Sequence, residues 1–273
     1  MVQVVVDGLA YGESARWHDG RLWLANWGTG EVLAVGADGR REVVVSVPAE
    51  TIPFSIDWTP DGTLLVIAGT TLFRHVDGQL VAAAELGGIA EIFNEIVVDS
   101  RGNVFVDGGW FDFSRPGVIA VVTPDGQVRQ VADGIVFGNG MAITPDDSTL
   151  IVAESQGRCL TAFDIASDGS LGHRRVWADL GEGHPDGICL DAKGAIWYAD
   201  VPAQRCVRVR EGGEVLEKVD LDRGAFSCML GGPDGTTLFM LSAQWRGFEH
   251  MLSPERTGVV STVEVAVPHA GRP

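Results

Sequence analysis

Four side chains with oxygen ligands stand at matching places along the sequence. Glu13 follows Tyr-Gly, Asn94 lies in Phe-Asn-Glu, Asn139 in Gly-Asn-Gly and Asp186 in Pro-Asp-Gly. Each precedes, by seven or eight residues, the turn of a repeated strand-turn-strand pattern. For any one of them alone, the simpler explanation is a turn former that hydrogen-bonds its own backbone. Four at one repeat position favour a binding site, and their oxygens suit hard divalent cations such as Ca²⁺, Mg²⁺ and Mn²⁺, whereas Zn²⁺ more often recruits His or Cys.

The pattern that must position these side chains is an apolar strand, an Asp/Gly turn and a second apolar strand. It occurs six times, for example over Ile56–Ala68 and Ile188–Asp200. Successive turns lie 40 to 47 residues apart, at Gly20, Gly62, Gly102, Asp147, Gly194 and Gly235. Such a regular period predicts a repeat architecture.

A second hairpin signal lies between successive copies, as in the Asp-Gly pairs at 77–78 and 125–126. Two hairpins per repeat make four strands, which is one blade of a β-propeller. We therefore expect an all-β fold: a six-bladed β-propeller of four-stranded antiparallel blades around a central channel, forming one domain over residues 1–273. Residues 2–6 and 261–267 lie outside the six copies and are expected to complete one blade together.

The first strand of each blade lines the channel of a propeller, so the residues that open these strands should face the axis. Glu13, Asn94, Asn139 and Asp186 are predicted to converge there. The other two blades contribute Phe54 with Ser55, and Ser227.

The charge balance excludes several classes of partner. The 273 residues include 37 acidic and 20 basic side chains, a formal net charge of −17, whereas nucleic acids and anionic membranes attract basic faces. No run approaches the ~18 apolar residues of a membrane helix, and the first residues lack the basic region of a secretory signal. Four cysteines without CxxC spacing are typical of buried side chains in a reducing compartment. We expect a cytoplasmic protein that binds neither nucleic acid nor membrane, and the sequence does not indicate its oligomeric state.

Several segments resemble the family of gluconolactonase, regucalcin (senescence marker protein) and luciferin-regenerating enzyme. They are residues 12–17, 137–155, 185–200 and 226–242, and the resemblance covers essentially the whole chain. It implies a six-bladed propeller with one divalent metal in the channel and a lactone-hydrolysing activity. By position, Glu13, Asn139 and Asp186 match the family's metal ligands, and Asn94 matches an Asn near metal and substrate. Ca²⁺ is the metal we expect first, with Mn²⁺, Mg²⁺ and Zn²⁺ as alternatives.

The chain departs from sugar-lactone members of that family at several positions. Ile92 stands where they commonly carry Arg, Glu95-Ile96 replace Asp-Gly, and Ser14-Ala15 replace Gly-Pro. Losing the Arg removes several donors for substrate hydroxyls. Aromatic residues in blade-connecting loops would add an apolar wall around the substrate, so we expect a lactone less polar than gluconolactone, contacted by Ile92, Trp110, Phe111, Phe113 and Trp245.

The predicted chemistry is carboxylic ester hydrolysis by a metal-dependent lactonase. A cation in the channel would polarise the lactone carbonyl and activate water, and it would stabilise the negative charge of the tetrahedral intermediate. Asp186 is our candidate for the catalytic group that handles the proton. His184 is the alternative and a candidate substrate contact, although a lone loop His more often packs or faces solvent.

Two other functions remain open from the sequence. One is a non-catalytic propeller that binds a ligand or a protein, since a fold does not determine a function. The other is an organophosphate or ester hydrolase that uses the same metal. Three aligned metal-ligand residues favour an enzyme over a scaffold, and the sequence contains no Gly-x-Ser-x-Gly elbow of a serine hydrolase.

Overall fold

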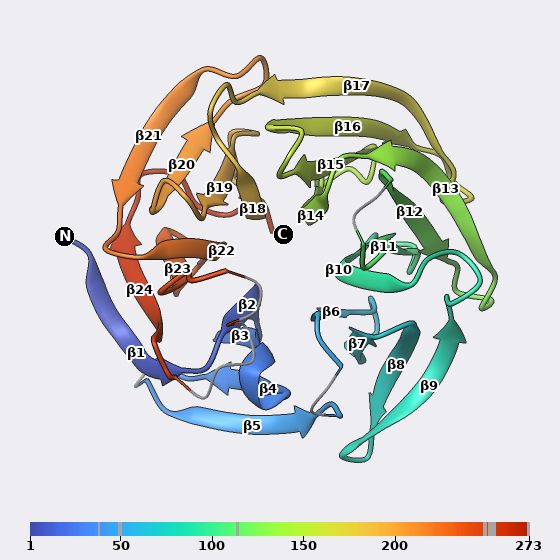
Figure 1. Ribbon diagram of the computed structural model, residues 1–273, viewed down its shortest axis with the longest axis horizontal. Helices are drawn as coiled ribbons and strands as arrows, with labels where there is room; N and C mark the ends of the chain where they lie inside the picture. The colour runs from blue at the N-terminus through green and yellow to red at the C-terminus, as the bar shows by residue number, and fades with distance from the viewer. Residues whose placement is uncertain (38, 49–50, 113–114, 248–249, 251–254, 272–273) are drawn as a thin grey trace.

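The computed structural model describes residues 1–37, 39–48, 51–112, 115–247, 250 and 255–271. Within these residues, six four-stranded antiparallel sheets form a ring around a central channel (Figure 1). The predicted all-β, six-bladed propeller is confirmed. No helix in the described part of the chain is long and apolar enough to cross a membrane.

The six sheets, numbered here as blades I to VI, follow one another along the chain. Blade I comprises β2 (Gly12–His18), β3 (Arg21–Asn26), β4 (Glu31–Val35) and β5 (Arg41–Ser46), with a 3-10 turn at Trp27–Thr29. Blade II comprises β6 (Phe54–Trp58), β7 (Leu64–Ala68), β8 (Thr71–Val76) and β9 (Gln79–Glu85). Blade III comprises β10 (Ile92–Val98), β11 (Val104–Gly109), β12 (Gly117–Val122) and β13 (Val128–Ile135).

Blades IV to VI complete the ring. Blade IV comprises β14 (Gly138–Ile143), β15 (Thr149–Glu154), β16 (Cys159–Ile165) and β17 (Leu171–Asp179). Blade V comprises β18 (Pro185–Leu190), β19 (Ile196–Asp200), β20 (Arg205–Val209) and β21 (Val215–Asp220). Blade VI comprises β22 (Gly224–Gly231), β23 (Thr237–Ala243), β24 (Gly258–Glu264) and β1 (Gln3–Leu9).

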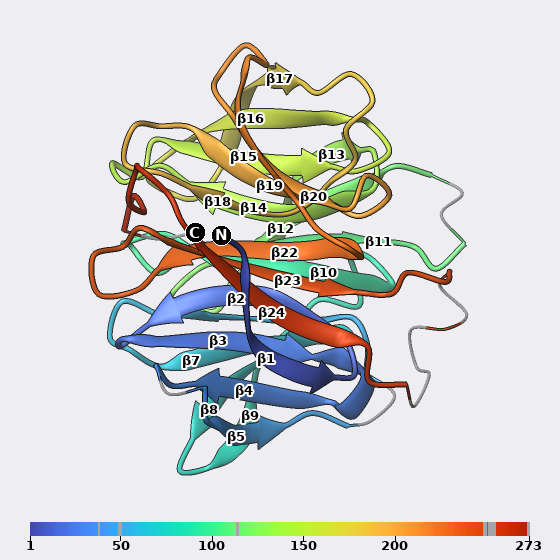
Figure 2. The ribbon, with the colours of Figure 1, turned by 90° about the vertical axis from the view of Figure 1, so that its left-hand side faces the viewer.

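Blade VI takes strands from both ends of the chain. β1 pairs antiparallel with β24 and forms the outer edge of this blade, as Figure 2 shows. Val6 and Leu9 of β1 are buried, whereas Val4 and Val5 are exposed. The predicted closure of the ring by the two terminal strands is confirmed.

The repeat spacing follows from the turns between the first two strands of each blade. The backbone has a positive φ at all six predicted turn residues, between 56° at Asp147 and 85° at Gly102. Gly adopts this conformation at no steric cost and Asp tolerates it, which explains why the pattern recurs at these residue types.

The inner strands β2, β6, β10, β14, β18 and β22 lie next to one another around the channel (Figure 1). They approach closely where blades IV, V and VI meet. A β-carbon on Gly140 would lie 2.5 Å from the Ile188 nitrogen, and one on Gly187 would lie 2.6 Å from Ser227 Oγ. Only glycine fits between these backbones. These two glycines directly follow Asn139 and Asp186, so they hold the two site residues at a short inter-blade distance.

The four cysteines are free thiols. Cys189, Cys206 and Cys228 are buried in one apolar cluster between blades V and VI. These three agree with the expectation of small buried side chains, whereas Cys159 is half-buried.

Candidate functional site

The structure brings the four predicted oxygen side chains together at one end of the channel. Each is the second or third residue of an inner strand: Glu13 in β2, Asn94 in β10, Asn139 in β14 and Asp186 in β18. Asn94 Nδ2 donates a hydrogen bond to Asn139 Oδ1 at 3.1 Å. The proximity of Asn139 lowers the pKa of Asp186, and the charge of Asp186 raises the pKa of Glu13.

Irregular strand pairing aims these side chains at the channel. The register of the first two strands shifts between Glu13 and Arg16 in blade I, and between Phe93 and Ile96 in blade III. It shifts again across Asn139 in blade IV and across Asp186 in blade V. A β-bulge re-aims a side chain and is common beside active sites. In blade II the same pairing is regular, and this blade presents Phe54 and Ser55 instead of a ligand.

Burial disfavours the charged forms of the Glu13 and Asp186 side chains. It raises the pKa of Glu13 well above its ordinary value, and the charges of Asp186 and Glu95 raise it further. Burial and then the charge of Glu95 raise the pKa of Asp186, while hydrogen bonds from Asn139 and Gly187 lower it. Neighbouring buried carboxylates of this kind are typical of functional sites.

One buried oxygen supplies a direct test of whether a cation fits. Asp186 Oδ1 is enclosed and has no hydrogen-bond partner among the described residues. Burying a carboxylate oxygen destabilises a protein unless that oxygen accepts a hydrogen bond, is paired with a cation or coordinates a metal. No group of three His, Cys, Asp or Glu side chains in the described residues is arranged to hold a metal. Glu13, Asp186 and Asn139 offer two carboxylates and an amide, a set of oxygen donors that would suit a hard cation.

A polar network lies next to the four site residues. Arg16 of β2 pairs with Glu95 of β10, with Nη2 to Oε1 at 2.7 Å. The same Glu95 oxygen accepts a hydrogen bond from Ser55, whose hydroxyl also bonds that of Ser14 at 2.7 Å. Asp107 Oδ1 accepts the backbone N–H of Glu95 at 2.6 Å, and burial raises the pKa of Asp107 well above its ordinary value.

His184 lies at the edge of the site. Its Nδ1 is 3.1 Å from the carbonyl oxygen of Ser155, so Nδ1 carries the proton and donates it. The Ser155 hydroxyl donates to the Pro185 carbonyl at 2.6 Å and accepts from Asn139 Nδ2 at 3.5 Å. Ser155 therefore links the half-buried His184 to the candidate ligands.

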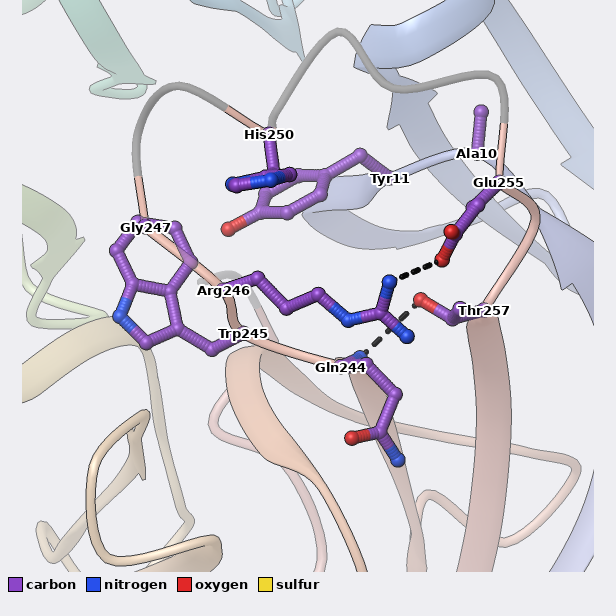
Figure 3. A pocket seen from close by; sticks show the side chains of 9 residues that line it. All are labelled: Ala10, Tyr11, Gln244, Trp245, Arg246, Gly247, His250, Glu255 and Thr257. Carbon is purple, nitrogen blue, oxygen red and sulfur yellow. Dashed lines mark hydrogen bonds and ion pairs between the residues drawn. The ribbon is translucent and has the colours of Figure 1, made fainter.

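An aromatic group stands beside the site on blades I and VI. Tyr11 lies 4.6 Å from Phe226 between ring centroids, and Phe226 lies 5.8 Å from Trp245. Burial raises the pKa of Tyr11, and the charges of Glu13 and Asp186 raise it further, which places this ring near both carboxylates. Tyr11 and Trp245 also border a small hollow that is open to solvent (Figure 3). Arg246 lies in the same hollow and pairs with Glu255 at 2.6 Å.

The other predicted substrate contacts lie on blade III. Ile92 is half-buried and pairs with Gly109. Trp110 packs against the apolar core of blades II and III, and the Arg115 guanidinium stands 3.6 Å from its ring centroid. Phe111 is 64% exposed, and Phe113 lies outside the described residues. The contacts between described residues join neither Trp110 nor Phe111 to the four central side chains, so the apolar wall on this blade stays a prediction.

The sequence profile of the SMP-30/Gluconolactonase/LRE-like region matches residues 11–244. The chain belongs to this family. A regucalcin of Xenopus laevis is 31% identical over 260 residues, 88% of this chain and 85% of that protein. A 6-deoxy-6-sulfogluconolactonase of Pseudomonas putida is 26% identical over 202 residues, 72% of this chain and 69% of that protein. A solved structure of the calcium-binding protein regucalcin from Agrobacterium tumefaciens has the same fold, with a TM-score of 0.82, 19% identity and coverage of 100% and 96% of the two chains.

The Arg16–Glu95 pair of this SMP-30/gluconolactonase-like chain was not predicted from the sequence. The two residues are 79 positions apart and come from blades that are not adjacent. The available signals were a charged residue directly before Trp17 in an inner strand, and the replacement of Asp-Gly by Glu95-Ile96. Neither signal indicates that Arg16 and Glu95 pair with each other.

Proposed function

We propose that this protein is a lactone hydrolase that holds one divalent cation on Glu13, Asn139 and Asp186. The observation that carries the proposal is Asp186 Oδ1, a buried carboxylate oxygen without a partner beside a second buried carboxylate. The relative from Pseudomonas putida is named a lactonase. Ca²⁺ is the first candidate, because the Agrobacterium regucalcin is described as calcium-binding and two carboxylates with an amide oxygen suit it.

When bound, the cation would supply a Lewis acid for the lactone carbonyl and a positive charge that eases deprotonation of water. Asp186 is our candidate to accept the proton as the water oxygen bonds to the carbonyl carbon. The ring C–O bond then breaks, and the ring oxygen leaves as a hydroxyl after taking back the proton that Asp186 accepted. The hydrogen bond from Asn94 fixes the Asn139 amide and leaves the second lone pair of Asn139 Oδ1 available.

The proposed substrate is less polar than gluconolactone. Ile92 offers no hydrogen-bond donor where sugar-lactone members commonly carry Arg. On the opposite side of the ring, Trp245 supplies exposed aromatic surface and packs on the buried ring of Phe226, which packs on the buried ring of Tyr11. A lactone with few hydroxyl groups would leave fewer polar groups unpaired in these surroundings.

The test compares wild type with Asp186→Asn, and Asp220→Asn on the outer strand β21 serves as a matched control. Metal content is measured by elemental analysis after purification without chelator, and turnover by pH indicator on gluconolactone and on lactones without hydroxyl groups. We expect wild type and control to bind a divalent metal and to hydrolyse the less polar lactones faster. Asp186→Asn should lose both properties.

Each result bears on a separate part of the proposal. Equal metal content in wild type and Asp186→Asn would remove Asp186 from the ligand set. Turnover that survives chelation would contradict the metal mechanism. A metal-loaded protein without turnover on any lactone would favour a binding propeller, and faster turnover of gluconolactone would contradict the role given to Ile92.

A further inference from the structure

The ion pair between Arg16 and Glu95 is buried and spans two blades. The side chains of Arg16 and Glu95 are 4% and 7% exposed. Arg16 Nη1 also donates to the Ala15 carbonyl at 2.9 Å, and Nη2 donates to the Ile96 carbonyl at 2.7 Å. The guanidinium therefore connects β2 of blade I to β10 of blade III, passing the inner strand of blade II that lies between them.

The two oxygens of Glu95 have different surroundings. Oε1 accepts hydrogen bonds from Arg16 at 2.7 Å, from the backbone N–H of Ile96 at 3.0 Å, and from the hydroxyls of Ser55 and Ser14. Oε2 has no partner among the described residues and, unlike Asp186 Oδ1, is not enclosed. The side chain is therefore held through Oε1, and Oε2 is left without a hydrogen bond from the described residues.

The charge of Glu95 reaches both candidate carboxylate ligands. Ser14 joins Glu95 to Glu13, because its hydroxyl donates to Glu95 Oε1 at 3.4 Å and its backbone N–H donates to Glu13 Oε2 at 3.3 Å. In agreement with this proximity, the charge of Glu95 raises the pKa of Asp186 and of Glu13. Charges interact more strongly inside a protein than in water, because the effective dielectric constant is lower. A third carboxylate therefore lies within electrostatic range of the ligand set without belonging to it.

We propose that Glu95 is a positioning residue for the cation: held by Arg16 and Ser55 beside Glu13 and Asp186, its negative charge strengthens cation binding from outside the ligand set. This inference rests on the proposed function. It assigns a role to the replacement of Asp-Gly by Glu95-Ile96 and to the arginine that accompanies it. Arg16 balances the charge of Glu95 in the protein interior, where an unpaired ion would be strongly destabilising.

The experiment titrates Ca²⁺ into chelator-treated, dialysed protein and measures the Kd by calorimetry. The variants are Glu95→Gln, Arg16→Met and the double variant Arg16→Met/Glu95→Gln. We expect Glu95→Gln to weaken Ca²⁺ binding by about tenfold or more. Arg16→Met should bind Ca²⁺ about tenfold more tightly than wild type, because it removes a positive charge. The double variant should lie within about threefold of wild type, since its net charge is unchanged.

A purely structural role predicts a different pattern, in which breaking the pair from either side weakens binding alike. Equal weakening in Glu95→Gln and Arg16→Met would overturn the inference, and so would a Kd for Glu95→Gln within about twofold of wild type. If Glu95→Gln alone does not fold, the double variant must bind about tenfold more weakly than Arg16→Met, because these two differ only at residue 95. If wild type binds no Ca²⁺, Mn²⁺ or Mg²⁺, the proposed function itself is contradicted. If wild type binds the cation and Glu95→Gln binds it with the same Kd, only this inference is contradicted.

Discussion

At the scale of single residues, the centre of the channel contains more buried acidic side chains than buried basic ones. Glu13, Asp107 and Asp186 have pKa values raised well above their ordinary range, and burial is the first cause for each. Arg16 is the buried cation that contacts this group through Glu95. Uncompensated buried carboxylates destabilise a fold, so their presence here favours a binding role.

Asp57 is a buried carboxylate whose loss of hydration is only partly compensated by hydrogen bonds. Its oxygens accept the backbone N–H groups of Trp58 at 2.9 Å and Val98 at 2.8 Å, so it connects β6 to β10. Burial raises its pKa to about 6, from an ordinary value of 3.8, although Arg16 and both N–H groups lower it. The native state therefore binds a proton at Asp57 more tightly than the unfolded state does.

The sign of the pH effect follows from this difference in proton binding. Asp57 does not oppose folding at a pH below 3.8, where it is protonated in both states, and it lowers the free energy of unfolding as the pH rises through about 6. We predict that Asp57→Asn becomes more stable relative to wild type by roughly 2–3 kcal/mol between pH 4 and pH 7. Urea unfolding of both proteins in chelator at the two pH values measures this change. A stability difference that is the same at both pH values would contradict the prediction.

At the scale of elements, the position of the site depends on bulges in the inner strands and on glycines between them. Asn139 and Asp186 are each followed by a glycine that touches the next blade. A methyl group at either position would meet backbone atoms, which cannot move as a flexible side chain can. The strands of blades IV and V therefore have little freedom to separate.

We predict that Gly140→Ala lowers stability by about 1–3 kcal/mol and weakens cation binding. Its β-carbon would lie 2.5 Å from the backbone nitrogen of Ile188 and 2.6 Å from the backbone carbonyl oxygen of Asp186, so the inner strands must shift at the two candidate ligands. Thermal unfolding in chelator measures the stability change, and calorimetric Ca²⁺ titration measures the binding change.

Gly172→Ala is the matched control. Gly172 lies in the outer strand β17, and a β-carbon there meets no atom within 4 Å. Stability and cation affinity should both stay near those of wild type. Unchanged Ca²⁺ affinity in Gly140→Ala would show that the site tolerates a change in the spacing of blades IV and V.

The sequence predicted the elements better than the contacts between them. The turn residues have local signatures, since Gly and Asp adopt positive φ, and so the six hairpins and their order could be identified. Their shared position within the repeat then predicted that four side chains lie at one end of the channel: Glu13, Asn94, Asn139 and Asp186. The Arg16–Glu95 pair could not be found in this way, because a repeat position shows which strand a residue occupies but not how far a long side chain reaches across the channel.

At the scale of the whole molecule, β1 ties the two ends of the chain together. It supplies the outer strand of blade VI and pairs with β24 from Gln3 to Leu9. Every blade packs against two neighbours, so an opening at blade VI removes contacts from both of its neighbours as well. We propose that the six blades form one domain that unfolds as a unit when this closure is lost.

The closure can be tested by two double variants within the same strand. Val6→Ala/Leu9→Ala removes buried methyl groups, as these residues are 5% and 1% exposed. Val4→Ala/Val5→Ala is the control, because these side chains are 60% and 40% exposed. We expect the first variant to lower the Tm by roughly 6–10 °C and the control to change it little. Because the ring unfolds as a unit, the far-UV and near-UV circular dichroism transitions of both variants should coincide. Two separate transitions, with blade VI melting first, would show instead that the remaining blades hold together without the closing strand.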